Sequence, residues 1–140
     1  MHTYLALDDH CFAIRQAARH ISQLYERHLA EAAMTPTQFS IMAALESRPD
    51  MTMADLADAM VMERTTLIRV LRPLLRTGLV RAAQEGPCTR RHQMSLTAEG
   101  RSRLAIAGVH FQAAQLEFEA RFGHEQAVQL RRELLRLTRR

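Results

Sequence analysis

The 140-residue sequence predicts a mainly α-helical fold with one small β-hairpin. Apolar residues recur at steps of three and four positions along most of the chain, which is the periodicity of amphipathic helices. Threonine, proline and glycine residues divide these periodic segments into separate helices. Residues 79–97 differ, because two short strand-like runs flank a Gly-Pro turn there.

The first two helices are predicted from an apolar stripe and a capping signal. The stripe of the first helix, over residues 7–29, consists of Leu7, Cys11, Ile14, Ala18, Ile21 and Tyr25. Its steps of four and three place these side chains on one side of the helix. Thr35 is a good N-cap for the second helix, with Pro36 at the first helical position and Gln38 able to complete a capping box. Pro49 should follow the end of this helix.

A pair of helices joined by a tight turn follows. Thr52 caps a short third helix. The fourth helix is expected from residue 63 or 64 to about Thr77, where Gly78 supplies the stop signal. About three residues separate the two helices, which is the spacing of a helix-turn-helix motif.

Two strands and two long helices complete the prediction. The strands are expected at residues 79–84 and 92–97, and together they form a wing beside the helix-turn-helix. Thr97 then caps a long helix over residues 98–121, and a last helix covers residues 124–139. The long helix has apolar residues on two faces, more than one small domain covers, so we expect the terminal helices to form a homodimer. A monomeric bundle is the alternative.

Composition excludes several classes of protein. The chain is 47% hydrophobic and has no run of 18 apolar residues, so no membrane partner is expected. The N-terminus lacks the pattern of a secretion signal, and the two cysteines are not spaced as a disulfide framework. These features predict a cytoplasmic protein.

Positive charge is concentrated in one part of the chain. Residues 64–103 contain nine arginines and two glutamates, a net charge of +7, whereas the whole chain has +4. The remaining residues therefore carry −3. Such a basic segment indicates a polyanionic partner, nucleic acid first, although a solvated surface is the alternative.

Several motifs resemble those of the MarR family of bacterial transcription regulators. The matching stretches are "MTPTQF" (34–39), "TMADLADAM" (52–60), "MERTTLIRVLRPLLRTGLV" (62–80) and "SLTAEGRSRL" (95–104). The resemblance covers roughly residues 7–138. It implies a winged helix-turn-helix dimer that binds a pseudo-palindromic double-stranded DNA operator, often as a repressor that a ligand or oxidant releases. It also implies a single domain over 1–140, with dimerisation helices at 1–33 and 98–140 around a DNA-binding lobe at 34–97.

The fourth helix and the wing carry the candidate DNA contacts. The first turns of a recognition helix enter the major groove, where arginine pairs with guanine. Arg64 and Arg69 are therefore expected to read bases, with Thr65 and Thr66 contacting bases or phosphates. Arg90 and Arg91 at the tip of the wing are expected to enter the minor groove.

Two effector sites are predicted from the resemblance. Family members bind aromatic ligands in a crevice between the dimer helices and the DNA-binding lobe, and the positions that would line it here are Arg15, Phe39, Met42 and His110. The first helix also resembles that of the hydroperoxide-sensing OhrR-like branch, in which a tyrosine fourteen positions after the reactive cysteine contacts the thiolate. Cys11 and Tyr25 have this spacing.

Other functions have weaker support. No phosphate-binding loop, HExxH motif or paired cysteine motif is present, so neither an enzyme nor a cofactor is expected. Seven scattered histidines leave a metal-responsive regulator as an alternative, although no ligand spacing predicts a metal site. A winged helix that contacts only proteins, without an effector, is the other alternative.

Overall fold

A computed structural model describes residues 8–84 and 92–139. The elements in chain order are α1 (His10–Leu29), η2 (Ala30–Ala32), α2 (Pro36–Ser47), β1 (Met51–Thr52), α3 (Met53–Met60), α4 (Arg64–Arg76), β2 (Val80–Gln84), β3 (His92–Leu96), α5 (Ala98–Phe122) and α6 (His124–Thr138). The predicted fold class is confirmed: the chain is mainly helical with a small winged sheet.

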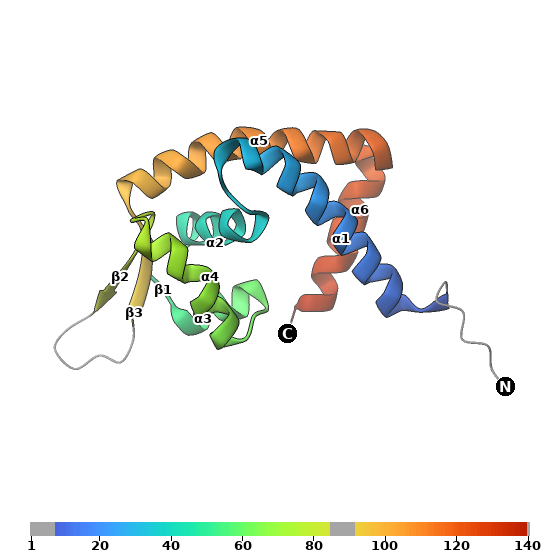
Figure 1. Cartoon of the computed structure of the whole chain (residues 1–140). Helices are drawn as coiled ribbons and strands as arrows, with labels where there is room; N and C mark the ends of the chain where they lie inside the picture. The colour runs from blue at the N-terminus through green and yellow to red at the C-terminus, as the bar shows by residue number, and fades with distance from the viewer. Residues whose placement is uncertain (1–7, 85–91, 140) are drawn as a thin grey trace.

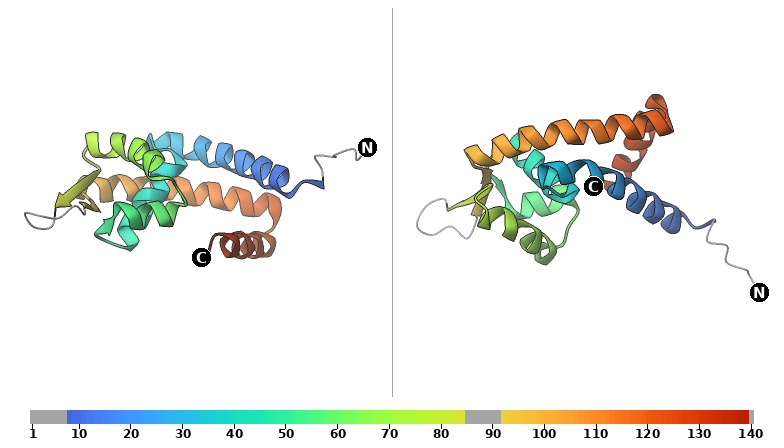
Figure 2. Two further views of the ribbon diagram at one scale, coloured as in Figure 1. Left: turned by 90° about the horizontal axis from the view of Figure 1, so that it is seen from below. Right: turned by 45° about the horizontal axis from the view of Figure 1, so that its top comes forward.

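The long helix α5 connects two differently built regions (Figure 1). At one end, α2, α3, α4 and the sheet form a lobe. At the other end, α1 runs beside α5, and α6 turns back from the end of α5. The views in Figure 2 show the N-terminal half of α1 projecting away from the lobe, whereas α6 folds back from the end of α5. We call α1, α5 and α6 the terminal helices.

Threonine caps fix where the helices of the lobe begin. The Thr35 hydroxyl accepts the Gln38 N–H, and the Gln38 side chain accepts the Thr35 N–H, so the predicted capping box is confirmed. Thr52 caps α3 in the same way, with Asp55 as the reciprocal partner. Each cap satisfies backbone N–H groups that the first turn leaves without a helical partner.

The sheet has one strand more than the sequence predicts. Its order is β1-β3-β2, antiparallel throughout. The β2–β3 hairpin is the expected wing. The two-residue strand β1 pairs Met51 with Met94 of β3, a long-range contact for which so short a segment carries no local signal. The predicted tip of the wing lies outside the described residues.

The start of α5 packs tightly against the end of α4. The Thr97 hydroxyl accepts the Gly100 N–H and donates to the Gly78 carbonyl at 2.6 Å. A Cβ atom on Gly100 would overlap the carbonyl oxygen of Leu79. Glycine is therefore required at position 100, because α5 approaches the backbone between α4 and β2 too closely for a side chain.

The stripe predicted for α1 is only partly buried. Within the chain the buried residues of α1 are Leu24 and Leu29, which the predicted stripe did not include. Cys11 is exposed. Ile14, by contrast, faces a cavity between the terminal helices. The periodicity correctly predicted the helix, and the exposure of most of its stripe in the single chain agrees with the expected packing of the terminal helices in a homodimer.

Candidate nucleic-acid interface and interhelical cavity

Helix α4 has one apolar face and one basic face. Leu67, Leu71 and Leu74 are buried in the core of the lobe. Their steps of four and three fix the orientation of the helix. Arg64 and Arg69 are exposed on the other side. Thr65 is exposed, and Thr66 is half-buried. The structure thus presents the candidate base-reading side chains to solvent.

The arginines of α4 differ from the other described arginines of the basic segment, because they have no polar partner among the described residues. Arg81 donates to the Ser95 hydroxyl at 3.2 Å, Arg101 lies 3.5 Å from a carboxylate oxygen of Glu46, and Arg103 donates to a backbone carbonyl. Within residues 8–84 and 92–139, none of the α4 arginines forms an ion pair or side-chain hydrogen bond: Arg64, Arg69, Arg72 and Arg76. Their charges are available to a ligand.

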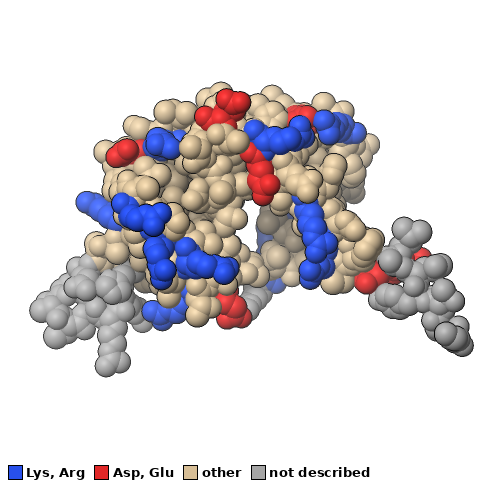
Figure 3. Space-filling view, in the orientation of Figure 1, with Lys and Arg blue, Asp and Glu red and all other residues tan. Residues whose placement is uncertain are grey.

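Arg72 and Arg76 extend this surface beyond the residues predicted from sequence. They follow Arg69 at steps of three and four, and both are exposed. Like the buried leucines, these arginines are spaced so that they lie on one face of the helix. This spacing could have identified Arg72 and Arg76 from the sequence. Figure 3 shows basic side chains gathered over the lobe beside the wing. Arg90 and Arg91 lie outside the described residues.

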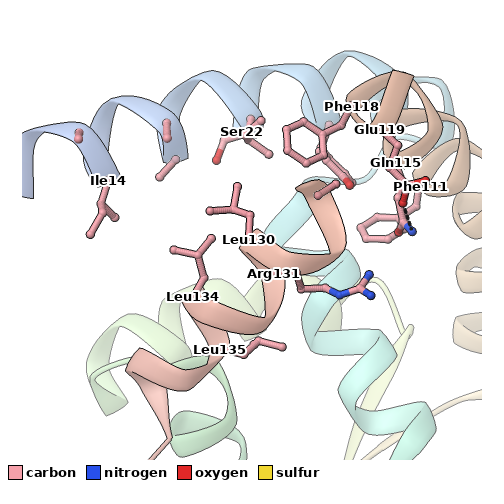
Figure 4. Close-up of a pocket in the computed structure, with 16 residues that line it drawn as sticks. Ile14, Ser22, Phe111, Gln115, Phe118, Glu119, Leu130, Arg131, Leu134 and Leu135 are labelled. Atoms are coloured by element: carbon pink, nitrogen blue, oxygen red, sulfur yellow. Dashed lines mark hydrogen bonds between the residues drawn. The ribbon is translucent and has the colours of Figure 1, made fainter. Parts of the chain in front are cut away.

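A cavity of about 730 Å³ separates α1 from α6, with α5 as its third wall. Most of its lining is apolar (Figure 4). Leu130 and Leu134 of α6 point toward α1, which contributes Ile14, and Phe118 lies between the helices. Large apolar side chains that border a cavity this open are not covered by their own chain.

Polar groups gather where the cavity meets the α5–α6 turn. Glu119 accepts a hydrogen bond from Gln115 at 3.3 Å and lies 2.8 Å from Nδ1 of His124. The bond to His124 holds the pKa of the Glu119 carboxyl below its ordinary value, against the effect of desolvation. Burial, and then the charge of Glu119, raise the pKa of Tyr25. Tyr25 is therefore a neutral hydroxyl at neutral pH.

The residues predicted to bind an aromatic ligand do not line this cavity. Met42 is fully buried in the core of the lobe. Phe39 stacks on Phe111 with ring centroids 4.2 Å apart. Arg15 is exposed on α1 and His110 is half-buried on α5. Phe39 packs against the same core cluster that contains Met42, and the shared ligand crevice remains a prediction.

Cys11 and Tyr25 do not meet within one chain. Both lie on α1, fourteen residues apart, which corresponds to about 21 Å along the helix axis. Tyr25 packs instead against Phe111 of α5, with centroids 5.0 Å apart. A contact between this thiol and this hydroxyl requires two copies of the chain.

Two further findings concern metals and membranes. In the described part of the chain, no three His, Cys, Asp or Glu side chains are grouped so that they could hold a metal ion. Among the same residues, no helix has the length and apolar character needed to cross a membrane.

Comparison with known proteins gives a consistent result. The model of the MarR family matches residues 34–85. The transcriptional regulator HosA of Escherichia coli O127:H6 is 31% identical over 120 residues, which cover 81% of this chain and 89% of HosA.

Solved structures extend the likeness over nearly the whole chain. The M. tuberculosis transcriptional regulator MosR, in complex with DNA, is 36% identical, with a TM-score of 0.82 and 94% of each chain covered. The transcriptional repressor CouR, bound to a 23-mer DNA duplex, superposes with a TM-score of 0.88 over 99% of each chain. At 21% identity, CouR supports the fold alone.

Proposed function

Because the chain belongs to the MarR family of transcriptional regulators, we propose that it binds a pseudo-palindromic DNA operator as a homodimer and represses transcription. The fourth helix enters the major groove of each half-site, with Arg64 and Arg69 on base edges and Thr65 and Thr66 on bases or phosphates. Arg90 and Arg91 of the wing enter the minor groove. The chain is a regulator and not an enzyme.

The two faces of α4 carry this proposal. Its leucines anchor the helix in the lobe, while its four arginines are exposed and have no partner among the described residues. Arg72 and Arg76, further from the start of the helix, fit phosphate contacts that position the lobe without reading sequence. The complex of MosR with DNA supports the same use of the lobe, since that relative is 36% identical.

The proposal includes the domain division predicted from the sequence. Residues 34–97 are assigned to the DNA-binding lobe, and residues 1–33 and 98–140 to the dimerisation segments. The cavity between α1 and α6 supports dimerisation, because a second copy of the chain would cover the apolar side chains that border it.

Operator binding tests the assignment of α4. Duplexes enriched by the wild-type protein from a random library serve as the operator. Arg64→Ala or Arg69→Ala should cost about 1–3 kcal/mol and relax the preference at one base position. Arg91→Ala should weaken binding to all sequences evenly, and wild-type affinity should fall steeply with salt. Arg139→Ala, at the exposed end of α6, is the charge-matched control. Unchanged affinity in all three lobe variants would contradict this docking.

Two effector chemistries are candidates: a small aromatic ligand, and oxidation of Cys11. The exposure of Cys11 favours oxidation, because a sensor thiol must be accessible. An organic hydroperoxide would be attacked by the thiolate sulfur. The O–O bond breaks, the sulfur becomes a sulfenic acid, and the other oxygen leaves as an alcohol.

A comparison of two cysteine variants decides between these effectors. Wild type should release the operator after treatment with an organic hydroperoxide, Cys11→Ser should retain it, and Cys88→Ser should behave as wild type. If wild type and Cys11→Ser respond equally, Cys11 is not the switch. If a phenolic carboxylate caused both wild type and Cys11→Ser to release the operator, the effector would be an aromatic ligand.

A further inference from the structure

Val61 has a backbone conformation that its side chain disfavours. It lies in the three-residue turn between α3 and α4, with φ 52° and ψ 48°, the left-handed region. Two other non-glycine residues in the described chain have positive φ, Ala33 and Asp50. Aspartate tolerates this region and alanine has no branch at Cβ, whereas for a β-branched residue it is a rare and strained conformation.

The turn itself calls for glycine at this position. The Val61 N–H donates to the Asp58 carbonyl at 3.2 Å, and the Met62 N–H donates to the Ala57 carbonyl at 2.9 Å. This is the hydrogen-bond pattern of a Schellman-type helix end, whose left-handed residue is usually glycine. Valine therefore makes the end of α3 less stable than glycine would.

Packing within the chain does not offset this strain. The Val61 side chain is 68% exposed. Its neighbours Met60 and Met62 both pack against the core of the lobe, and Val61 does not. Neither the strained backbone nor the exposed apolar side chain of Val61 stabilises the isolated fold. Strained residues of this kind are concentrated at functional sites.

The location of Val61 indicates which partner would cover it. It precedes Arg64 by three residues, at the junction where the chain enters the proposed recognition helix (Figure 1). The exposed side chains that follow it there, those of Glu63, Arg64 and Thr65, are polar. On the base edges of the major groove, the apolar group available to a valine is the C5 methyl of thymine.

We propose that Val61 contacts a thymine methyl group in each operator half-site and thereby determines specificity at that base pair. This inference rests on the proposed docking of α4 in the major groove. The Val61 side chain is largely exposed in the free protein, and DNA binding covers one of its methyl groups.

Parallel selections from a random duplex library test the contact. The wild-type motif should contain one thymine per half-site that Val61→Gly no longer selects, while the other preferred bases remain. Loss of one buried methyl contact should weaken binding about fourfold per half-site, or about 15-fold for the dimer. The melting temperature of Val61→Gly should not fall, because glycine suits the turn. Val61→Asn, which also tolerates this backbone, should lose the same thymine.

Uracil separates the methyl contact from any change in the turn, because it is thymine without the methyl group. Uracil at that position should weaken wild type about fourfold per half-site and leave Val61→Gly unchanged. Ala33→Gly, which relieves another left-handed residue, should bind as wild type. The inference would be overturned if Val61→Gly selected the same thymine with wild-type affinity. It would also be overturned if uracil lowered the operator affinity of both proteins equally. Enrichment of no sequence by the wild type would instead overturn the proposed operator binding on which it rests.

Discussion

The lobe and the terminal helices bury their apolar residues to very different degrees. Every buried residue of the main core cluster lies between Leu29 and Ala107, which the lobe and the adjoining turns of α1 and α5 contribute. In α6 the buried residue is Ala127. Its four leucines are exposed: Leu130, Leu134, Leu135 and Leu137. The lobe therefore completes its own core, whereas the terminal helices need a second copy of the chain.

The interactions that hold the terminal helices together within one chain also differ from those of the lobe. The described lobe is held by leucine and methionine packing. Helix α1 is attached to α5 by apolar packing and by His28, whose Nε2 lies 2.6 Å from a carboxylate oxygen of Glu117. Near the same end of α5, Nδ1 of His124 of α6 lies 2.8 Å from a carboxylate oxygen of Glu119. Half-buried polar contacts orient the helices but supply little of the stability that burial provides.

Truncation of a leucine in the lobe should have the largest effect. Leu71 is fully buried, so Leu71→Ala should lower the free energy of unfolding by about 2–5 kcal/mol, measured by urea denaturation. Leu75, on the same helix, is 38% exposed. Leu75→Ala is the matched control and should cost about 0.5 kcal/mol or less. Equal losses in the two variants would mean that the lobe has no self-contained core.

Substitution on α6 should change the dimer and leave the lobe intact. Leu134 borders the cavity and is 41% exposed in the single chain, nearly the same as Leu75. Leu134→Gln should weaken dimerisation by about 1–3 kcal/mol, because each protomer loses apolar contact. Sedimentation equilibrium measures this as a shift toward monomer. Leu75→Gln, which matches Leu134→Gln in chemistry and exposure, should remain dimeric. If both variant dimers dissociated, or if neither did, the result would contradict a specific role of α6 in the dimer interface.

The junction of the two regions should be sensitive to a single methyl group. Gly100→Ala places Cβ against the Leu79 carbonyl and should destabilise the fold by about 1–3 kcal/mol. Gly108 lies on the same helix with nothing near the position of a Cβ atom. Gly108→Ala should therefore stabilise by about 0.5–1 kcal/mol, as expected for helix propensity. Thermal melts of the two variants should shift in opposite directions, and a shared direction would show that α5 does not approach Leu79 so closely.

Local signals predicted the lobe well because its elements carry their own start and stop residues. Thr35, Thr52 and Thr97 cap the helices that the sequence assigned to them, and Gly123 separates α5 from α6. Strand β1 was missed because its pairing with β3 depends on contacts 40 residues away. Periodicity also does not distinguish an apolar stripe that is buried within the chain from one that is buried only in a dimer. Helix α1 is an example, because its buried residues are Leu24 and Leu29.

The candidate sites were predictable to different extents for the same reason. The exposure of Arg64 and Arg69 follows from the leucine spacing of a single helix. The aromatic-ligand site depended on how three helices approach one another, and there Met42 proved to be core. The strain at Val61 comes from its positive φ angle, and the residue type alone does not predict that angle.

The smallest expected effect concerns the polar contact that joins α1 to α5. The hydrogen bond from His28 is the largest cause that lowers the pKa of the Glu117 carboxyl below its ordinary value of 4.5. Desolvation opposes it, and the charges of Arg121 and Arg27 lower the pKa further. Since the folded protein favours the ionised form, this stabilisation is present above pH 4.5 and is lost as the pH falls through the lowered pKa.

Glu117→Gln should therefore melt slightly below wild type at pH 7, and the difference should shrink as the pH falls below 4.5. Glu26→Gln, on the exposed side of α1, is the control and should show no such pH-dependent difference, since its carboxylate has no partner among the described residues. If the difference in melting temperature between Glu117→Gln and wild type stayed constant with pH, the charge of Glu117 would not contribute to this contact. The terminal helices would then be held by packing alone, as the lobe is.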